Sequence, residues 1–391
     1  MSEVVIAGIG QTPVGEFWDV SLRTLAVRAM RAALRDAGAL EPDSPLKPRA
    51  LYIGNMLAST ASHQSNLGAL LVESAGLDGI EGITVEAAGA SGGAAFRLGY
   101  MAVASGYVEC ALVLGVEKHT DLVGVKAESA VTQMLDYDYE TVQGLTPTGQ
   151  AALLMQRYLY EYHPPRAAFG AFALLAHANA VNNPNAMYRR AISQKMYDES
   201  EPICDPLNLF DIAPYADGAA AVLLARSDRV SHLAQPLVRV TGSALAGDRL
   251  ALHDRKDLLA FEAAELSIQR ACSQAGIIPS DVDLFELCDS YSIYAALSLE
   301  AAGLAPRGAG WKLAQDGGLG LNGKMPICTR GGMKARGNPI GAAGVYQIVE
   351  AAQQLRGSEG SGVAGAKKAL VQCLGGAAVT AAAHVLERWE G

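Results

Sequence analysis

Two stretches of this chain, DAGALEPDSPLKPRALYIGN at residues 36–55 and QAGIIPSDVDLFELCDS at residues 274–290, show the same order of features. Each starts near an Ala-Gly pair, passes through a proline-containing turn and continues into an apolar, β-prone run. An order of features that recurs within one chain indicates an internal duplication. The fold is therefore expected to contain two copies of one structural unit.

The sequence around both stretches extends this correspondence. Each stretch follows a β-prone segment and an amphipathic helix pattern: VVIAGIGQT and SLRTLAVRAMRAALRD in the first copy, LVRVTGSALAG and LAFEAAELSIQRACS in the second. Further on, GASGGAAFRLGYMAVASG and CALVLGVE match GNPIGAAGVYQIVEAAQQLRG and, after a Gly/Ser-rich loop, ALVQCLGG. Strands that alternate with helices predict an α/β fold of duplicated βαβαβ-type units, with a parallel-type sheet covered by helices.

The chain divides on this basis into two halves and an insertion. Residues 1–118 and 216–232 form the N-terminal half, and residues 235–391 form the C-terminal half. Residues 119–215 fit neither copy, are rich in Tyr, Asn and Pro, and are too long for a simple connection. We therefore expect a partly helical inserted loop domain, of the kind that usually covers or shapes a site.

Composition excludes several classes of function. The net charge of -9 argues against nucleic-acid binding, and the apolar runs are too short for a membrane span. No leader-like segment opens the chain, so a cytoplasmic protein is expected. Only 18% of the 391 residues are charged, which is compatible with oligomer or partner interfaces.

The motifs that the sequence lacks exclude further classes of protein. The six cysteines form no CxxC pair, so neither a metal site nor a disulfide framework is indicated. GIGQTP at residues 8–13 lacks the third glycine of a dinucleotide fingerprint, and the motifs of α/β-hydrolases, zincins and P-loop proteins are absent.

Chemistry in such a duplicated fold is expected where strands end and helices begin, because helix N-termini present unpaired N–H groups. The repeat alignment places four such tips together: Gly89, the segment Cys288–Tyr291, Asn338, and the turn Cys373–Gly376.

The residues at these tips, with motifs spread along most of the chain, resemble those of the thiolase superfamily. The motifs include VEAAGASGGAA, LVLGVEKHTD, DPLNLFDIAPYADGAAA, GGMKARGNPIGAAGVYQ and CLGGAAVTAAAHVLER. The resemblance is to the sterol-carrier-type and archaeal acetoacetyl-CoA thiolase branch. It implies a thiolase fold, a five-layer αβαβα sandwich, and coenzyme A thioesters as substrate or ligand with no other bound cofactor. It also implies a homodimer or dimer of dimers, and a small zinc-ribbon/OB-fold partner protein.

The catalytic positions implied by the resemblance are altered in this chain. The cysteine that carries the acyl group in the family corresponds to Gly89, and the histidine of the family's GHP motif corresponds to Asn338. The HDxF motif reads Cys288-Asp289-Ser290-Tyr291, and only Cys373-Leu374-Gly375 keeps the thiol of the CxG motif. Ordinary thiolysis or Claisen condensation is therefore in doubt, because a thiolate needs a base and an oxyanion needs preorganised donors.

These changes leave several hypotheses about the function open. Cys288 or Cys373 could replace the missing nucleophile, although the nearest family-matched histidine is His177 in the insertion. Alternatively, an aldolase-type lyase could cleave β-hydroxyacyl-CoA with tyrosine hydroxyl groups, without a covalent intermediate. A non-catalytic acyl-CoA-binding or scaffold subunit is a further reading, and so is a glycine that replaces a natural cysteine at position 89.

Glycine at position 89 has several implications of its own. It would relieve backbone strain at the tip, leave room for a bulkier hydroxyacyl group, and retain a backbone N–H for an oxyanion. The candidate catalytic residues are Cys288, Asn338, Cys373, Tyr294 and Tyr346. The candidate substrate-binding residues are Gly89, Ser91, Asp289, Tyr291, His177 and Gly375.

Overall fold

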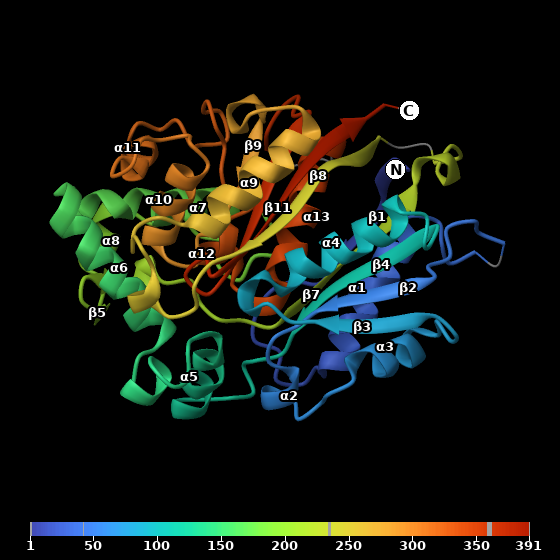
Figure 1. Cartoon of the computed structure of the whole chain (residues 1–391), viewed down its shortest axis with the longest axis horizontal. Helices are drawn as coiled ribbons and strands as arrows, with labels where there is room; N and C mark the ends of the chain where they lie inside the picture. Colours follow the sequence, from blue (N-terminus) through green and yellow to red (C-terminus); the bar gives the residue numbers. More distant parts are fainter. Residues whose placement is uncertain (1, 42, 234–235, 358–361, 391) are drawn as a thin grey trace.

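The computed structural model describes residues 2–41, 43–233, 236–357 and 362–390 (Figure 1). Nine strands in this part of the chain form one sheet, in the order β3-β2-β4-β7-β1-β8-β11-β10-β9. The strands are β1 (Val4–Gln11), β2 (Ala50–Gly54), β3 (Glu81–Val85), β4 (Cys110–Glu117), β7 (Gly218–Arg226), β8 (Leu237–Gly247), β9 (Leu284–Glu286), β10 (Lys368–Gly375) and β11 (Thr380–Trp389).

The strand order confirms the duplication. Strands β3-β2-β4-β7-β1 come from the first copy, and β8-β11-β10-β9 repeat the same sequence of elements in mirror order. The two copies meet where β1 pairs antiparallel with β8, at Val5 with Arg239 and Ile6 with Val238. The counterpart of β3 in the second copy is reduced to a single bridge between Phe285 and Ile327.

The expectation of a parallel-type sheet was wrong for half of each copy. Parallel pairs are β2 with β3, β2 with β4, and β9 with β10, whereas β7 and β11 run antiparallel to their neighbours. The chain passes from β10 into β11 through residues 376–379, which is too short for a parallel crossover. Strands buried on both faces read as continuous apolar runs in either direction, so their sequence does not show orientation.

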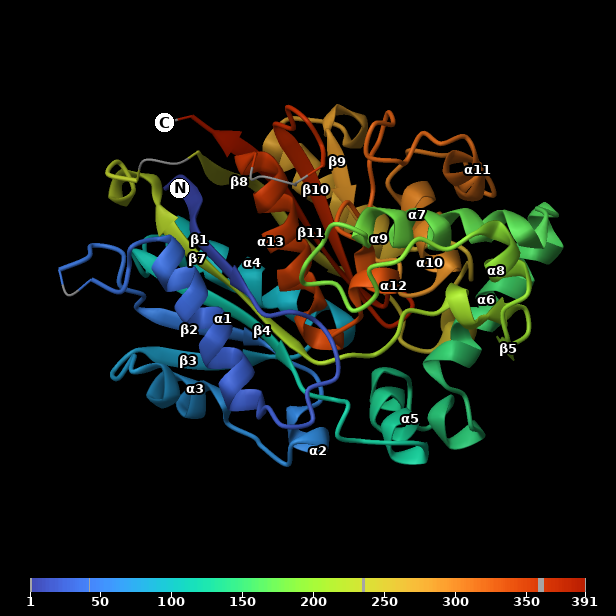
Figure 2. The ribbon, with the colours of Figure 1, turned by 180° about the vertical axis from the view of Figure 1, so that it is seen from behind.

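Helices on both faces of the two half-sheets complete five layers (Figures 1 and 2). One outer layer holds α1 (Leu22–Asp36) and α3 (Leu67–Ala75), and the other holds α9 (Glu262–Ala275) and α10 (Ser292–Ala301). Between the half-sheets lie α4 (Ser91–Ala104) and α13 (Ala343–Arg356). Twelve of the fourteen α13 residues are buried, which is typical of a helix enclosed on all sides.

The strands supply both cores through their alternating side chains. On β4, Leu112 and Leu114 pack against the outer helices, while Ala111 and Val113 face the central layer. The N-termini of α4 and α13 therefore reach the same end of the sheet as the carboxyl ends of the parallel strands.

The segment between β4 and β7 lies at one end of the molecule, to the left in Figure 1. It contains α5 (Val125–Val131), α6 (Pro147–Tyr162), α7 (Gly170–Ala180), α8 (Gln194–Asp198) and a two-stranded sheet of β5 (Pro202–Cys204) and β6 (Leu207–Asn208). Short helices α2 (Ala58–Ala61), α11 (Gly310–Gln315) and α12 (Gly332–Arg336) complete the structure. No helix in the described ranges is long and apolar enough to cross a membrane.

Two sequence expectations fall partly outside the described residues. The proposed start of the C-terminal half at residue 235 is one, and residues 358–361 of the Gly/Ser-rich loop are the other.

Candidate active site

The four tips singled out from the sequence lie around one small cavity at the carboxyl ends of the parallel strands. Its volume is about 40 Å³, and its walls include Gly89, Cys288, Asn338 and Leu374. The remaining wall residues are Met134, Pro147, Ala213, Tyr215, Ser290, Tyr291, Tyr294, Met333, Ile340 and Gly376. The structure thus brings residues from both copies and from the insertion to one place.

The Gly89 turn packs directly against the end of β10. A Cβ atom added at Gly89 would lie 2.6 Å from the Leu374 carbonyl oxygen, and one added at Gly375 would collide with the Ala87 carbonyl oxygen. The expected room for a bulkier acyl group is therefore absent, because the backbone of Leu374 fills the place of the missing side chain. The two glycines are needed for this close approach of one backbone to another.

The strained residue of the turn is Ala88 and not Gly89. Ala88 has φ 50°, and its counterpart in the second copy, Ile340, has φ 35°. Both copies therefore enter their central helix, α4 or α13, through the same sparsely populated backbone conformation. The expected strain exists, but it is one residue earlier than predicted.

Asn338 presents a fixed hydrogen-bond donor to the cavity. Its Oδ1 accepts a hydrogen bond of 3.1 Å from the Ile340 N–H, so the orientation of the amide group is determined. Its backbone is held on both sides, since Asn338 N–H donates to Pro214 O and Ala216 N–H donates to Asn338 O. The Nδ2 group of this cavity-wall residue can donate a hydrogen bond but cannot accept a proton.

Three tyrosines line the same cavity. The rings of Tyr291 and Tyr294 lie 4.9 Å apart, and the Tyr291 hydroxyl is 3.2 Å from Thr148 Oγ1. Burial raises the pKa of Tyr291 to about 12, and it also raises the pKa of Tyr215 and of Tyr294 well above the ordinary value for a phenol. All three phenols are therefore neutral near pH 7.

Tyr215 was missed by sequence reasoning. It ends the insertion and reaches the cavity because its backbone forms a β-bridge with Asn338. The only sequence signal was a large aromatic residue in PYADG, just before the chain returns to the sheet.

The two candidate thiols lack an activating base. Cys288 Sγ lies 3.5 Å from Ser290 Oγ and 3.8 Å from Met333 Sδ, and burial raises its pKa. The expected position of Cys373 at the pocket was wrong: its Sγ packs between Gly93 and Gly344 in the central layer, where burial raises its pKa. A buried thiol with a raised pKa is a poor nucleophile.

Other candidates also have their polar groups engaged elsewhere. Tyr346 was expected near the pocket, but its hydroxyl donates to Thr12 O at 3.0 Å in the core. Ser91 Oγ donates to Ala88 O and accepts from Ala87 N–H, which stabilises the start of α4. Asp289 is buried and accepts the Met333 N–H at 2.6 Å at the start of α12.

A larger groove of about 1040 Å³ adjoins the cavity and shares Ala213 and Tyr215 with it. Its lining is mostly apolar, with Tyr188, Met187, Ile192, Met196, Ile203, Leu209, Phe210, Ile212, Val181 and Pro214. His177 lies here and not at the cavity; its Nδ1 is 3.2 Å from Arg190 O, and burial lowers its pKa.

Charged side chains border this groove, and Glu128 is one of them. Arg189 and Arg190 are exposed, and the buried Lys334 donates to Asp211 O at 2.6 Å. Within the described ranges, no cluster of three or more His, Cys, Asp or Glu side chains could hold a metal ion.

The chain belongs to the thiolase family. Residues 4–228 match the model of the thiolase N-terminal domain, and residues 244–388 match the thiolase C-terminal domain-like model.

The relatives agree with this assignment. An acetyl-CoA acetyltransferase of Methanothermobacter thermautotrophicus is 38% identical over 99% of this chain and 100% of that protein. The benzoylsuccinyl-CoA thiolase subunit BbsB of Thauera aromatica is 32% identical over 90% of this chain and 89% of that protein. A solved structure described as the Ltp2-ChsH2(DUF35) aldolase has a TM-score of 0.86 at 24% identity, with 99% of this chain and 98% of that chain covered.

Proposed function

We propose that this thiolase-family chain is an acyl-CoA-handling enzyme of altered chemistry that forms or cleaves a carbon–carbon bond without an acyl-enzyme intermediate. Its substrate class is a β-hydroxyacyl-CoA, and the reaction is aldol-type. The observation that carries this proposal is a glycine at position 89, packed against the Leu374 carbonyl, in a cavity lined by three phenols and the Asn338 amide.

In the cleavage direction, the β-hydroxyl group loses its proton, the bond between Cα and Cβ breaks, and its electrons form the enolate of the thioester. Asn338 Nδ2 donates to the thioester oxygen, where the negative charge develops. Because the phenols are neutral, each one relays a proton: it accepts a proton from a neighbouring oxygen atom and at the same time donates its own proton to the next acceptor. The contact of Tyr291 with Thr148 provides such a hydroxyl chain. The enolate carbon finally takes the proton, giving a carbonyl product and a shorter acyl-CoA.

The adjoining groove supports a coenzyme A ester as the ligand. Its apolar walls suit a pantetheine arm, and the groove meets the cavity at Ala213 and Tyr215. Arg189 and Arg190 form no ion pair within the described part of the chain, so their guanidinium groups are available to phosphates. The names of the two relatives above also refer to CoA esters. The structure described as an aldolase shares the fold.

Acyl transfer through a relocated cysteine is less well supported. Cys288 is the only cysteine among the described cavity-wall residues, and no histidine stands beside it there. A non-catalytic acyl-CoA-binding subunit is a second candidate, since the cavity is small and would have to open to admit a thioester.

Turnover of defined esters separates these functions. Purified protein is assayed with β-hydroxyacyl-CoA and β-ketoacyl-CoA panels, with release of the shorter acyl-CoA measured by chromatography. We expect cleavage of β-hydroxy esters and a loss of about 100-fold or more in Tyr294→Phe and Asn338→Ala. Tyr160→Phe, at an exposed tyrosine of α6, is the matched control. Thiolysis of β-keto esters that Cys288→Ser abolishes would instead support acyl transfer, and CoA-ester binding without any turnover would support the binding subunit.

The proposal includes a zinc-ribbon/OB-fold partner, a homodimer or dimer of dimers, and a cytoplasmic location. Exposed apolar side chains flank the segment that carries Met134 to the cavity wall, which supports a partner at this end: Val123, Val125, Tyr137, Tyr139 and Val142. If the protein is inactive alone, the assay is repeated with such a partner added.

A further inference from the structure

We infer that Glu117 is a positioning residue of this site, which holds the turn after Asn338 so that the Asn338 amide faces the cavity. Glu117 ends β4 and lies outside the set of residues that line the cavity. The link to Asn338 is structural, and the catalytic consequence rests on the function proposed above.

The Glu117 carboxylate is completely buried and accepts four hydrogen bonds. Oε1 accepts from Asn55 Nδ2 at 2.8 Å and from Leu57 N–H at 3.0 Å. Oε2 accepts from Met56 N–H at 3.0 Å and from Gly341 N–H at 3.1 Å. All four partners are neutral donors, so the negative charge is balanced by amide dipoles and not by a cation.

The bond to Gly341 connects Glu117 to the cavity wall. A Cβ atom added at Gly341 would lie 2.7 Å from Glu117 Oε2, so the carboxylate seats against a position that glycine leaves open. The preceding residue, Ile340, has φ 35° and donates its N–H to Asn338 Oδ1. This backbone conformation is unfavourable for a β-branched residue and persists only where its surroundings hold it. The hydrogen bond from Gly341 N–H to Glu117 fixes the backbone at the residue that follows Ile340.

The duplication provides an internal comparison. Glu117 is the last residue of the eight-residue strand β4, and the last residue of its eight-residue counterpart β10 is Gly375. On that side the glycines at positions 89 and 375 lie against backbone carbonyl oxygens, those of Leu374 and Ala87. The buried carboxylate therefore exists only on the side that carries Asn338.

The charge of Glu117 changes near neutral pH. Burial raises its pKa to about 7 in spite of the four hydrogen bonds. A proton on either oxygen would face a donor, so protonation must displace at least one partner. On β4 and just after it, the charged groups are Lys118, paired with Asp121 and Asp217, and His119, whose pKa is lowered by burial. The 55–57 loop and the 340–342 turn carry no titratable side chain.

The pH dependence of turnover tests this inference. Because the pKa is about 7, we expect the kcat of the wild type to fall about tenfold from pH 8 to pH 6, with little change in KM. Glu117→Gln should lose this acid limb and stay near the low value at both pH values. Glu286→Gln is the matched control, because Glu286 is also fully buried with a pKa of about 7 but binds Thr329 instead of the turn. An acid limb that survives Glu117→Gln, or that Glu286→Gln removes, overturns the inference.

Amide exchange provides a readout that needs no substrate. At pH 8, hydrogen–deuterium exchange of the peptide spanning residues 338–343 should be faster in Glu117→Gln than in the wild type, while the peptide spanning residues 284–290 is unchanged. Equal exchange in the 338–343 peptide overturns the inference even if the enzyme is active. Faster exchange in a protein that turns over no ester at any pH supports the role of Glu117 and refutes the proposed function instead.

Discussion

At the scale of single residues, position 89 carries no side chain, and the backbone of a distant segment lies where a side chain would begin. The Gly89 turn still begins α4 and still borders the cavity, but the Leu374 carbonyl oxygen occupies the place where a side chain would start. Glycine at this position is therefore part of the packing between the two copies. Restoring a cysteine would require β10 to move.

Gly89→Cys tests this packing. The new Cβ atom would lie 2.6 Å from Leu374 O, so we expect the free energy of unfolding to fall by about 1–3 kcal/mol, as for other overpacked sites. No acyl-enzyme should appear in the mass spectrum after incubation with acetyl-CoA. Gly15→Ala is the control, because its Cβ would meet only Phe17 at an ordinary 3.7 Å. A stable Gly89→Cys variant that gains an acetyl group would contradict the argument.

His384 on β11 governs part of the acid stability. It is fully buried, its Nδ1 lies 3.0 Å from Ser243 Oγ, and burial together with Arg97 lowers its pKa to about 3. The unfolded chain binds a proton here below about pH 6.5 and the folded chain does not, so stability is lost as pH falls from 6.5 towards 3.

This histidine is expected to remove about 2 kcal/mol from the free energy of unfolding between pH 7.5 and pH 5. His384→Asn, which keeps a polar partner for Ser243, should lack that contribution. Urea unfolding of both proteins at the two pH values measures how much free energy of unfolding each one loses. The contributions of other titrating groups, such as Glu117 and Glu286, cancel when the two losses are compared. An equal loss of stability in the variant would show that His384 does not contribute.

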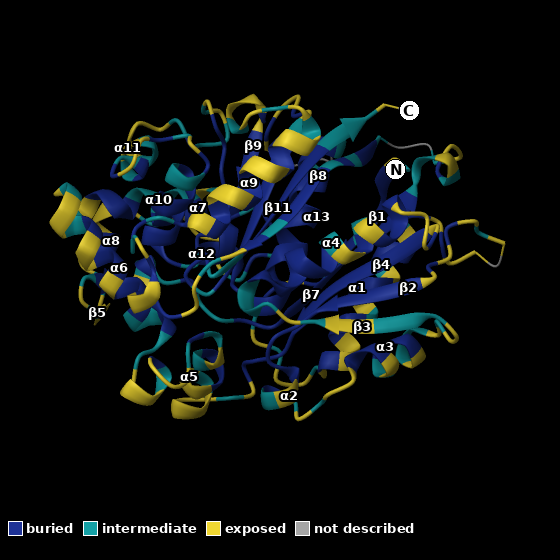
Figure 3. Cartoon of the chain, in the orientation of Figure 1, coloured by how far each residue is buried: buried dark blue, intermediate teal, exposed yellow. Residues whose placement is uncertain are grey.

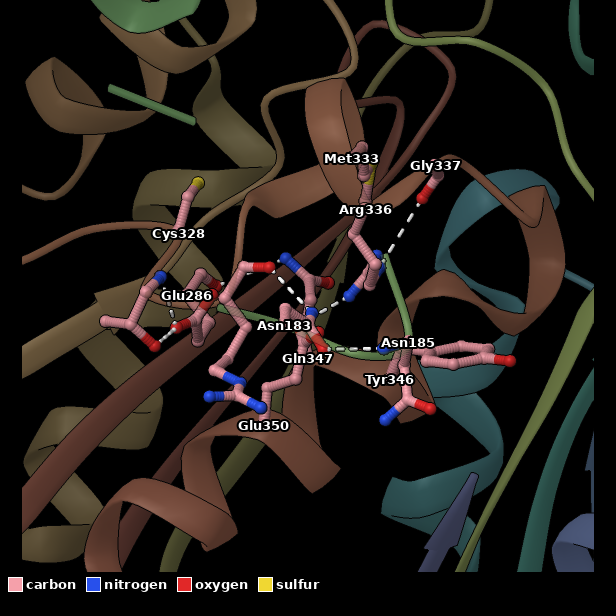
Figure 4. Close-up of polar contacts among 12 residues, drawn as sticks. Asn183, Asn185, Glu286, Cys328, Met333, Arg336, Gly337, Tyr346, Gln347 and Glu350 are labelled. Atoms are coloured by element: carbon pink, nitrogen blue, oxygen red, sulfur yellow. Dashed lines mark hydrogen bonds and ion pairs between the residues drawn. The ribbon is translucent and has the colours of Figure 1, made fainter. Parts of the chain in front are cut away.

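At the scale of elements, α12 and α13 are joined by an ion pair inside the core (Figure 4). Arg336 Nη1 lies 2.6 Å from Glu350 Oε2, and both side chains are completely buried. The Arg336 guanidinium also lies 5.1 Å from the centroid of the Tyr346 ring, which is itself buried in the core. The pair fixes α12, and with it the segment that leads into Asn338.

Removing one partner of this pair should be strongly destabilising. Arg336→Met leaves Glu350 buried without its ion-pair partner, with an expected cost of about 3–5 kcal/mol in the free energy of unfolding. The double variant Arg336→Met/Glu350→Leu should recover most of that loss. Arg157→Met, in the exposed pair with Glu161 on α6, is the control and should cost less than about 1 kcal/mol. Chemical denaturation measures all four proteins, and a double variant no more stable than Arg336→Met would contradict this account.

At the scale of the whole molecule, β3 forms one edge of the nine-stranded sheet and is the least buried of the strands in that sheet (Figure 3). Ile83 on this edge is 48% exposed, and Met101 and Tyr107, on and just after the neighbouring α4, are also exposed. An apolar sheet edge with free backbone groups is a surface that proteins usually cover. A second copy of this chain would cover it in the proposed homodimer.

Ile83→Glu tests the dimer at this edge. Light scattering after size-exclusion chromatography should give twice the mass of one chain for the wild type and a single-chain mass for the variant at micromolar concentration. Val125→Glu places the same charge on the exposed insertion and should leave the mass unchanged. A wild type that is monomeric, or an Ile83→Glu variant that remains dimeric, would exclude this interface.

Much of the architecture was predictable because it depends on local patterns. The paired stretches 36–55 and 274–290 contain β2 and β9 at equivalent places, and the helix patterns became α1, α4, α9 and α13. The altered identities at Gly89 and Asn338 were also visible, since a motif is a property of the sequence. Strand direction was not, because a fully buried strand has the same apolar composition in both orientations.

The sequence by itself determined the duplication, the family and the glycine at the turn, because each depends on residue identity and order. The tertiary structure alone decided what packs against Gly89 and what holds the turn opposite it. Glu117 and Gly341 are 224 residues apart in the chain, and Leu374 O meets Gly89 only because β10 packs beside the start of α4. Such contacts depend on ångström-scale distances between distant segments, which close packing fixes and composition does not encode.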